Sequence, residues 1–319
     1  MSCMKPKIYI DGQEGTTGLR IRERLLERKD LELLEIDPEK HRDEAERRRF
    51  IDQADLVFLC LPDAAAVEAV QLIGAENRHT KVIDASTAHR VAGGWVYGLP
   101  ELSGSQRQMI QSARFVANPG CHATGFITAA APLVAAGIIP PDYPFSIFSL
   151  TGYSGGGKKM IREYESETCP ETYQAPRIYG LSQQHKHLPE MMRYAGLTET
   201  PVFCPVVDDY YSGMAVTISI DARLLPDKGR NCSKERIRQT LTEHYKNAEL
   251  ISVSPLDTEG MLSAGELSGS DRLALFVNGT DDRITVTAVF DNLGKGASGA
   301  AVQNMNLMLG YPETKGLVC

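Results

Sequence analysis

A chain of 319 residues is too long for one ordinary hydrophobic core, so its length predicts two domains. Its formal net charge of -7 argues against a general nucleic-acid or membrane-surface binder, although a local basic pocket stays possible. No stretch supplies the roughly 20 uninterrupted apolar residues of a membrane span, and the N-terminal residues lack a signal-peptide layout. Seven scattered cysteines without a CxxC pair argue against a disulfide framework or a zinc site, so we expect a cytoplasmic protein that binds no metal.

The first 118 residues alternate between expected strands and helices. Apolar runs predict strands at 7–11, 31–36, 55–62, 81–87 and 113–120. Helical patterns lie between them: an amphipathic one with Leu19, Ile21, Leu25 and Leu26, and two more at 38–54 and 63–75. This alternation predicts an α/β domain with a Rossmann-type, doubly wound parallel sheet and helices on both faces.

The pattern changes after Cys121. An apolar helix is expected at 126–139, where Gly137 and the Pro140-Pro141 pair end it. Strand-rich segments follow at 145–159, 202–224, 249–254 and 273–294, with a hairpin signal at "NGTDD". A last helix is expected at 295–310, with Ala301, Val302, Met305 and Leu309 on one stripe. We therefore expect an α+β second domain with a mainly antiparallel sheet.

The turn after the first strand carries Gly12, Gly15 and Gly18, spaced three residues apart. Glycines at such a turn let the backbone approach a pyrophosphate at a helix N-terminus, although a purely structural turn is the alternative. Asp37 after the second strand would favour NAD, whereas Arg20 or Arg22 would meet the 2′-phosphate of NADP. The pattern leaves the choice between the two cofactors open.

Cys121 lies in "NPGCHATG", between a Pro-Gly turn and an apolar helix. A helix N-terminus stabilises a thiolate, which is the nucleophilic form of cysteine, and its N–H groups can also hold an oxyanion. A buried packing cysteine is the alternative, but the polar neighbours in "CHATG" make this a poor place for an apolar filler. We expect Cys121 to be a nucleophile.

His185 and His187 precede a helix that Pro189 and Glu190 begin. Histidine is the side chain best matched to proton transfer near neutral pH, which a catalytic cysteine requires. A metal site or a solvent-facing pair are the alternatives, and no HExxH spacing supports the metal. The remaining histidines have weaker contexts: His41, His79, His89, His122 and His244.

Two further glycine-rich segments are candidate anion sites. "GYSGGGKK" combines Ser154 with Lys158 and Lys159, which suits a phosphate or carboxylate, or else forms a flexible loop. "GKGASGAAVQN" is a second glycine-rich helix start, which could hold a phosphate or allow close helix packing.

These segments occur in an order that resembles one family. "GTTG", "DASTAHR", "YGLPEL", "ANPGCHATG", "GYSGGGKK", "HKHLPE" and "DNLGKGASGAAVQNMN" together resemble N-acetyl-γ-glutamyl-phosphate reductase over essentially the whole chain. That family comprises NADPH-dependent semialdehyde dehydrogenases of arginine biosynthesis. The short chain and the glycine spacing resemble its shorter, second type. Lys158 stands where longer members have Arg, which loses a bidentate contact.

The resemblance implies a reaction through a thioester on Cys121, with His187 as general acid/base and His185 orienting it or binding substrate. It implies contacts to NADP(H) from Gly12, Gly15, Thr16, Thr17, Gly18, Ser86, Thr87 and Gly296. It implies contacts to an acyl-phosphate substrate from Ser154, Lys158 and Arg114.

The resemblance also implies a domain division. Residues 1–118 would form the dinucleotide domain, completed by 296–319, and 119–295 the catalytic and oligomerisation domain. A homo-oligomer, either a dimer or a tetramer, is expected.

Three other functions stay open at this stage. Another cysteine semialdehyde dehydrogenase would act on aspartyl phosphate or glyceraldehyde 3-phosphate, but those enzymes surround their cysteine with Asn and Thr. A carrier-bound aminoadipyl substrate would need a basic docking surface. A nucleotide-sensing regulator of the same fold would not need Cys121 and both histidines.

Overall fold

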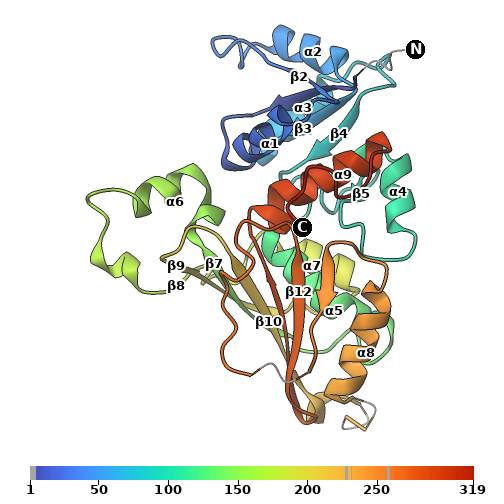
Figure 1. Ribbon diagram of the computed structural model, residues 1–319, viewed down its shortest axis with the longest axis vertical. Coiled ribbons are helices and arrows are strands. Elements are labelled where there is room, and N and C mark those ends of the chain that lie inside the picture. The colour runs from blue at the N-terminus through green and yellow to red at the C-terminus, as the bar shows by residue number, and fades with distance from the viewer. Residues whose placement is uncertain (1–4, 227–228, 231, 257–258) are drawn as a thin grey trace. The chain divides into compact units, whose positions relative to one another are not determined.

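The computed structural model describes residues 5–226, 229–230, 232–256 and 259–319, and these form two compact units (Figure 1). Unit 1 contains the described residues up to Pro100, then Ser105–Pro119 and Ala297–Leu317. Unit 2 contains Glu101–Gly104, Gly120–Gly296 and Val318–Cys319. Cys3 lies outside the described residues.

Unit 1 is built on a six-stranded sheet in the order β2-β1-β3-β4-β6-β5, in which every neighbouring pair is parallel. Its strands are β1 (Lys7–Asp11), β2 (Glu32–Leu34), β3 (Leu56–Leu59), β4 (Lys81–Asp84), β5 (Val96–Tyr97) and β6 (Phe115–Ala117). Its helices are α1 (Thr16–Leu26), α2 (Glu44–Gln53), α3 (Asp63–Gln71), α4 (Gln106–Ser112) and α9 (Gly299–Leu309).

Both faces of this sheet are buried, as a doubly wound fold requires. Ile8 and Ile10 of β1 pack in one hydrophobic cluster with residues of α1, α4 and α9. Tyr9, whose side chain points to the opposite face, packs in a second cluster with residues of α2 and α3. The predicted parallel sheet is confirmed.

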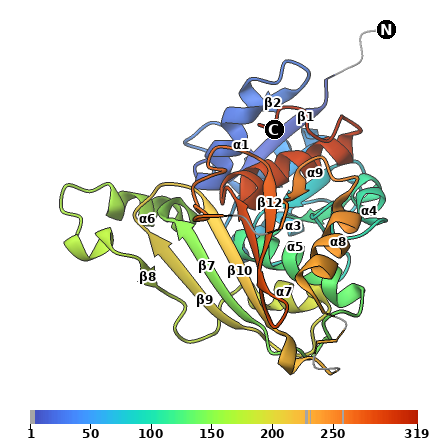
Figure 2. The ribbon, with the colours of Figure 1, turned by 60° about the horizontal axis from the view of Figure 1, so that its bottom comes forward.

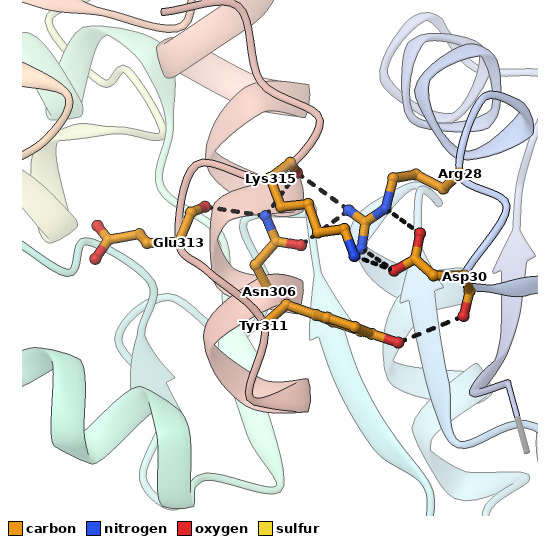
Figure 3. Close-up of polar contacts among 6 residues, drawn as sticks. All are labelled: Arg28, Asp30, Asn306, Tyr311, Glu313 and Lys315. Atoms are coloured by element: carbon orange, nitrogen blue, oxygen red, sulfur yellow. Dashed lines mark hydrogen bonds and ion pairs between the residues drawn. The ribbon is translucent and has the colours of Figure 1, made fainter. Parts of the chain in front are cut away.

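A network of hydrogen bonds and ion pairs connects the last segment of unit 1 to the residues that follow α1 (Figure 3). The buried guanidinium of Arg28 donates to both carboxylate oxygens of Asp30 at 2.8 Å, and to Oδ1 of Asn306 at 3.0 Å. It also donates to the main-chain oxygen of Lys315, and the ammonium of Lys315 lies 2.9 Å from Asp30. These contacts join residues near the start of the chain to residues near its end.

Unit 2 is built on a seven-stranded mixed sheet in the order β11-β12-β13-β10-β7-β9-β8. Only the pairs β11–β12 and β7–β9 are parallel, so the predicted mainly antiparallel sheet is confirmed. Its strands are β7 (Ser146–Gly152), β8 (Arg177–Ile178), β9 (Val202–Asp208), β10 (Met214–Asp221), β11 (Ile251–Val253), β12 (Leu273–Thr280) and β13 (Arg283–Phe290). Thr280 pairs with Arg283, which places a two-residue hairpin turn at the predicted position.

The helices of unit 2 are α5 (Cys121–Ala135), α6 (Gly157–Tyr164), α7 (Leu188–Ala195) and α8 (Lys234–Tyr245). Helix α5 packs closely on the sheet, because a Cβ on Gly125 would lie only 2.5 Å from Val216 of β10. Helix α6 belongs to a segment that projects beyond the ends of β7 and β9 (Figures 1 and 2). Among the described residues, every helix is too short or too polar to cross a membrane.

Helix α5 contains Pro132, which has no N–H to donate to the carbonyl of Thr128 one turn earlier. The Tyr245 hydroxyl, from the end of α8, donates to this carbonyl at 2.8 Å. The buried carbonyl that the proline would leave unsatisfied is therefore bonded.

Candidate active site

The N-terminus of α5 positions Cys121. Gly120 is the N-cap, its carbonyl accepts from the Thr124 N–H at 2.8 Å, and the first turn contains no acidic residue. The remaining N–H groups of this turn and the helix dipole favour negative charge at the sulfur. The buried carboxylate of Glu190, in the first turn of α7, accepts from the Gly120 N–H at 3.1 Å and so links the two helix starts.

Cys121 lines a pocket of about 120 Å³ within unit 2. The other lining residues are His122, Thr151, Gly152, Gly155, Gly156, Met160, Tyr179, His185, Lys186, His187 and Val207. The structure thus brings together Cys121, His185 and His187, the three residues that the sequence predicts to be catalytic. Their roles stay predictions.

Three imidazole rings meet at this pocket. The ring centroids of His185 and His187 are 4.7 Å apart, and that of His122 lies 5.5 Å from the first and 5.6 Å from the second. His187 is the buried N-cap of α7, and its main-chain N–H donates to Nδ1 of His185 at 3.2 Å. When the His185 ring is neutral, its proton is therefore assigned to Nε2.

His122 has only a weak context in the sequence, yet it is a buried part of the pocket wall. Its Nδ1 lies 2.8 Å from the Ser149 hydroxyl and its Nε2 lies 2.6 Å from the Tyr179 hydroxyl. Burial, and then the charge of His185, lowers the pKa of His122 to about 3. The ring is therefore neutral at physiological pH. Its position next to Cys121 in the chain was the one available signal.

The loop that carries His185 is fixed to strand β9 through Gln183. The side-chain amide of Gln183 accepts from the Phe203 N–H at 2.9 Å and donates to the Phe203 carbonyl at 2.8 Å. Gln183 has a φ of 57°, a left-handed conformation that costs energy for a residue other than glycine. The Phe203 ring in turn packs 5.1 Å from the His185 ring, so the loop and the strand position the imidazole together.

Gly296 lies against the nucleophile. A Cβ at this position would be 2.9 Å from Cβ of Cys121 and 3.1 Å from the Asp291 carbonyl oxygen. Gly296 is expected from the sequence to contact the cofactor, and the structure adds a steric reason for glycine here. A side chain would push on Cys121.

The residues expected to bind the substrate anion do not line this pocket. Ser154 is buried, and its hydroxyl accepts from the Asn292 amide at 3.0 Å. Lys158 is two residues from Met160 in α6, so the two side chains leave the helix on different sides. Met160 faces the pocket, whereas Lys158 lines a separate open groove with Lys159 and Arg162.

Arg114 belongs to unit 1 and has other partners. It precedes β6, and its guanidinium donates to the main-chain oxygens of Thr80 at 3.1 Å and Asn77 at 2.5 Å. These contacts indicate a structural role, which differs from the expected substrate contact. Lys186 is the basic side chain among the pocket residues that the structure describes, and sequence reasoning did not select it.

The glycine-rich turn of unit 1 fits a pyrophosphate. Gly12 has a φ of +86°, and a Cβ there would collide with the Cys60 carbonyl oxygen. A Cβ on Gly18 would lie 2.6 Å from the Gly12 carbonyl oxygen. Helix α1 starts after Gly15 without a side-chain cap or an acidic residue in its first turn, and Oγ1 of Thr16 is buried without a hydrogen-bond partner among the described residues. Thr17 follows in the same turn. The turn therefore offers a helix N-terminus and a free hydroxyl to an anion.

Ser86 and Thr87 lie after β4, on the edge of the sheet where ligands bind in doubly wound folds. The Ser86 hydroxyl donates to Asp84 at 2.7 Å, and the Thr87 main-chain N–H donates to Asp63 at 2.9 Å. Both residues are therefore held in this loop by hydrogen bonds to carboxylates.

The three residues considered for contacts to the ribose or its 2′-phosphate each have a partner within unit 1. Arg20 lies 3.1 Å from Glu23, and Arg22 forms an ion pair with Glu35. Asp37 accepts from the Glu39 N–H at 3.0 Å. These contacts do not separate NAD from NADP.

The other cysteines have different surroundings from Cys121. None of the six cysteines in the described ranges forms a disulfide. Burial, and then the charge of Asp84, raises the pKa of the Cys60 thiol. Within the same ranges, no three His, Cys, Asp or Glu side chains are grouped to hold a metal ion.

Comparison with known proteins gives the family. Residues 8–111 match the family described as "Semialdehyde dehydrogenase, NAD binding domain", and residues 121–292 match "Semialdehyde dehydrogenase, dimerisation domain". An N-acetyl-gamma-glutamyl-phosphate reductase of Rhizobium meliloti is 47% identical over 96% of this chain and 99% of its own length. One from Brucella ovis is 46% identical over 96% of this chain and 100% of its own length.

The chain belongs to the N-acetyl-γ-glutamyl-phosphate reductase family. The resemblance described from the sequence is therefore confirmed, and the matched NAD binding domain indicates a nicotinamide cofactor. Among solved structures, aspartate semialdehyde dehydrogenase II of Vibrio cholerae has a TM-score of 0.69 at 16% identity, over 97% of this chain and 99% of its own. An aspartate semialdehyde dehydrogenase of Francisella tularensis has a TM-score of 0.67 at 15% identity, over 95% of this chain and 99% of its own. At identities this low, the similarity to these two structures shows the fold of the chain and nothing more.

Proposed function

We propose that this chain reduces N-acetyl-γ-glutamyl phosphate to N-acetylglutamate 5-semialdehyde and phosphate with NADPH. The observation that carries the proposal is the pocket in which Cys121, at a helix N-terminus, meets His185 and His187. The relatives at 46–47% identity, which bear the name of this reductase, support the choice of substrate.

In the proposed reaction the Cys121 thiolate attacks the acyl carbon, and the oxyanion forms near the N-terminus of α5. Phosphate then leaves as the carbonyl re-forms, and a thioester on Cys121 remains. Bound NADPH supplies the hydride that reduces this thioester. The resulting hemithioacetal releases the semialdehyde when the thiolate departs, and a proton must be moved at each of these steps.

His187 is proposed as the group that moves these protons, and His185 as the residue that orients it or contacts substrate. His187 is buried as the N-cap of α7, which limits the movement of its ring. His185 is only partly buried, its ring lines the pocket, and its Nδ1 accepts the His187 N–H.

The cationic contact to the substrate is assigned to Lys186 rather than to Lys158 or Arg114, since Lys186 lines the pocket. The cofactor contacts are proposed at Gly12, Gly15, Thr16, Thr17 and Gly18. Phosphate-bearing NADP is preferred over NAD in this proposal, which rests on the family. A kcat/KM ratio that favours NAD by tenfold, about 1.4 kcal/mol, would reverse it.

A homo-oligomer is proposed as well. The face of the unit 2 sheet opposite α5 exposes Phe148 of β7 and Val202 of β9, which are 47% and 61% exposed. Apolar side chains that face solvent on neighbouring strands suit a second copy of the chain. Sedimentation of the purified chain tests this.

The deciding assay is reduction of NADP by N-acetylglutamate 5-semialdehyde, with and without phosphate. Phosphate-dependent turnover, and at most weak turnover with aspartate semialdehyde, is expected. A preference for aspartate semialdehyde would instead make the chain an aspartate-type dehydrogenase. Binding of NADP without any turnover would favour a nucleotide-sensing regulator.

Cys121→Ser is expected to bind cofactor and to lose nearly all turnover, because a hydroxyl is far less ionised than a thiol at neutral pH. Cys204→Ser, in β9 outside the pocket, is the matched control and should keep its activity. Substantial activity of Cys121→Ser would contradict the assignment of the nucleophile.

A further inference from the structure

A chain of three hydrogen-bonding side chains crosses the wall of the pocket. Ser149 of β7 is fully buried, and its hydroxyl contacts Nδ1 of His122 at 2.8 Å. Nε2 of His122 contacts the hydroxyl of Tyr179 at 2.6 Å. Tyr179 follows β8 directly, and its main-chain N–H donates to the Pro205 carbonyl of β9 at 3.0 Å. The mechanism proposed above uses none of these three side chains.

The direction of the hydrogen bonds in this chain follows from what each group can do. A neutral imidazole donates from one nitrogen and accepts at the other. If Nδ1 carried the proton, the Ser149 hydroxyl would have to donate elsewhere, and no acceptor for it is found among the described residues. If Nε2 carries it, Ser149 donates to Nδ1 and His122 donates to the Tyr179 oxygen. Each tautomer thus leaves one hydroxyl proton without an acceptor in this chain of three side chains: that of Ser149 in the first and that of Tyr179 in the second. The second is favoured, because Ser149 is fully buried whereas Tyr179 lines the pocket, and a buried donor left without an acceptor costs about 1–3 kcal/mol.

In this tautomer the Tyr179 proton is not used by His122, so it is available to the pocket that Tyr179 lines together with Cys121. Burial, and then the negative charge of Cys121, raises the pKa of Tyr179, so the hydroxyl stays protonated in this pocket. A hydroxyl that stays protonated beside a thiolate can donate a hydrogen bond to any oxyanion that forms there.

We propose that the Tyr179 hydroxyl donates a hydrogen bond to the oxygen that becomes negative when Cys121 attacks an acyl carbon, and that His122 is the positioning residue that aims it. The Tyr179 donor supplements the N–H groups at the start of α5. No bond other than the hydrogen bond is formed by Tyr179, and its proton stays on its oxygen. This inference rests on the proposed role of Cys121 as an acylated nucleophile.

The test compares two reactions of Cys121 that need neither the cofactor nor the natural substrate. Acylation by p-nitrophenyl acetate passes through an oxyanion, whereas alkylation by iodoacetamide does not. Tyr179→Phe should slow the acylation burst about 10²–10³-fold, the usual cost of one oxyanion donor. It should leave the alkylation rate within about twofold of the wild type. Tyr153→Phe, in the same unit but outside the pocket lining, should change neither rate.

His122 is tested by a pair of variants. His122→Phe should slow acylation about 10-fold, because the Tyr179 hydroxyl is present but no longer held. His122→Gln should recover part of this loss, since a side-chain amide can also donate to Tyr179 and accept from Ser149.

The tautomer of His122 is a second measurement that needs no variant to fold. In ¹⁵N-histidine-labelled protein, with His122→Gln used only to assign the signal, the His122 ring should be neutral and protonated at Nε2. Protonation at Nδ1 would overturn the proposal, because the Tyr179 hydroxyl would then donate its hydrogen bond to Nε2 of His122 and not to the oxyanion.

The kinetic outcomes also separate two failures. Equal slowing of acylation and alkylation by Tyr179→Phe, or no slowing of either, would overturn the role of Tyr179. If the wild type does not turn over N-acetylglutamate 5-semialdehyde while Tyr179→Phe still slows only acylation, the proposed function fails and this inference stands.

Discussion

Gly296 contacts Cys121 so closely that any side chain there must displace the nucleophile or the turn that carries the glycine. Gly296→Ala adds a methyl group 2.9 Å from Cβ of Cys121 and 3.1 Å from the Asp291 oxygen. We expect kcat to fall about 10²-fold, since a displacement of the order of 1 Å in reacting groups has this cost. The control is Gly265→Ala, whose nearest neighbour is the Ser263 hydroxyl at 3.7 Å. Unchanged kcat for Gly296→Ala would show that the turn relaxes.

His185 and His187 are proposed to have different roles, so substitutions at the two positions should affect different kinetic constants. His187→Asn should lower kcat about 10²–10⁴-fold and flatten its pH profile, as loss of a general acid/base does. His185→Asn should act mainly on KM, because the partly buried ring lines the pocket and its Nδ1 accepts the His187 N–H. Steady-state kinetics from about pH 6 to 9 brackets His titration. A larger kcat loss in His185→Asn reverses the assignment.

The sequence predicted three residues that line one pocket, Cys121, His185 and His187, because each lies in a recognisable local motif. Cys121 follows a Pro-Gly turn at a helix start, and "HKHLPE" precedes another, so neighbours in the chain were sufficient. Lys158 was selected from its glycine-rich loop and the family resemblance, and Arg114 from the resemblance. Their actual contacts depend on which side of a helix or sheet edge they occupy. His122 had only its place beside Cys121 to indicate it and Tyr179 had no signal, because the contacts of His122 with Ser149 and Tyr179 exist only in the folded chain.

Pro132 of α5 and Tyr245 of α8 should be energetically coupled, because both act on the Thr128 carbonyl. Tyr245→Phe leaves the buried Thr128 carbonyl without its donor and should lower the free energy of unfolding by about 1–3 kcal/mol. Pro132→Ala restores an N–H one turn after Thr128, so the same Tyr245→Phe change should cost less in that background. Urea unfolding of the four proteins measures the coupling. Equal costs in both backgrounds would mean that the tyrosine acts through packing alone.

Elements with a strong period were predicted, and short or context-dependent ones were not. Apart from β5, the strands of unit 1 and the β12–β13 hairpin have continuous apolar or alternating patterns. Strand β5 has only two residues, and α4 has seven, so neither carries a readable period. The glycine-rich segment after β7 was expected as an anion loop or a flexible one, yet it continues into α6, because tertiary contacts decide the conformation of such a segment.

For the molecule as a whole, the network of Arg28, Asp30 and Lys315 joins the first helix to the last segment and should make stability depend on pH. The hydrogen bond from Arg28, and further on that from Lys315, holds the pKa of Asp30 well below its usual value. A carboxyl group whose pKa is lower in the folded chain than in the unfolded chain stabilises the fold at pH values above its unfolded pKa, which is about 4. This stabilisation is lost as the pH falls further.

The urea midpoint of Asp30→Asn should therefore lie below that of the wild type at pH 7, and the gap should shrink towards pH 3. Glu46→Gln is the control, because its partner Arg49 is exposed and such pairs contribute little. A gap for Asp30→Asn that stays constant from pH 7 to 3 would contradict the electrostatic role of this carboxylate.

The discontinuity of unit 1 has a consequence for the order of events on the ribosome. Ala301, Val302 and Met305 of α9 are buried in the same cluster as Ile8 and Ile10 of β1, although Gly120–Gly296 is translated between them. At about 5–20 residues per second the wait is roughly 10 to 35 s, during which this face of the first-made sheet lacks its closing helix. The main segment of unit 2 is continuous, so unit 2 can complete its core before unit 1 does. Unit 1 emerges first and completes its core last. It therefore has the longer need of a chaperone.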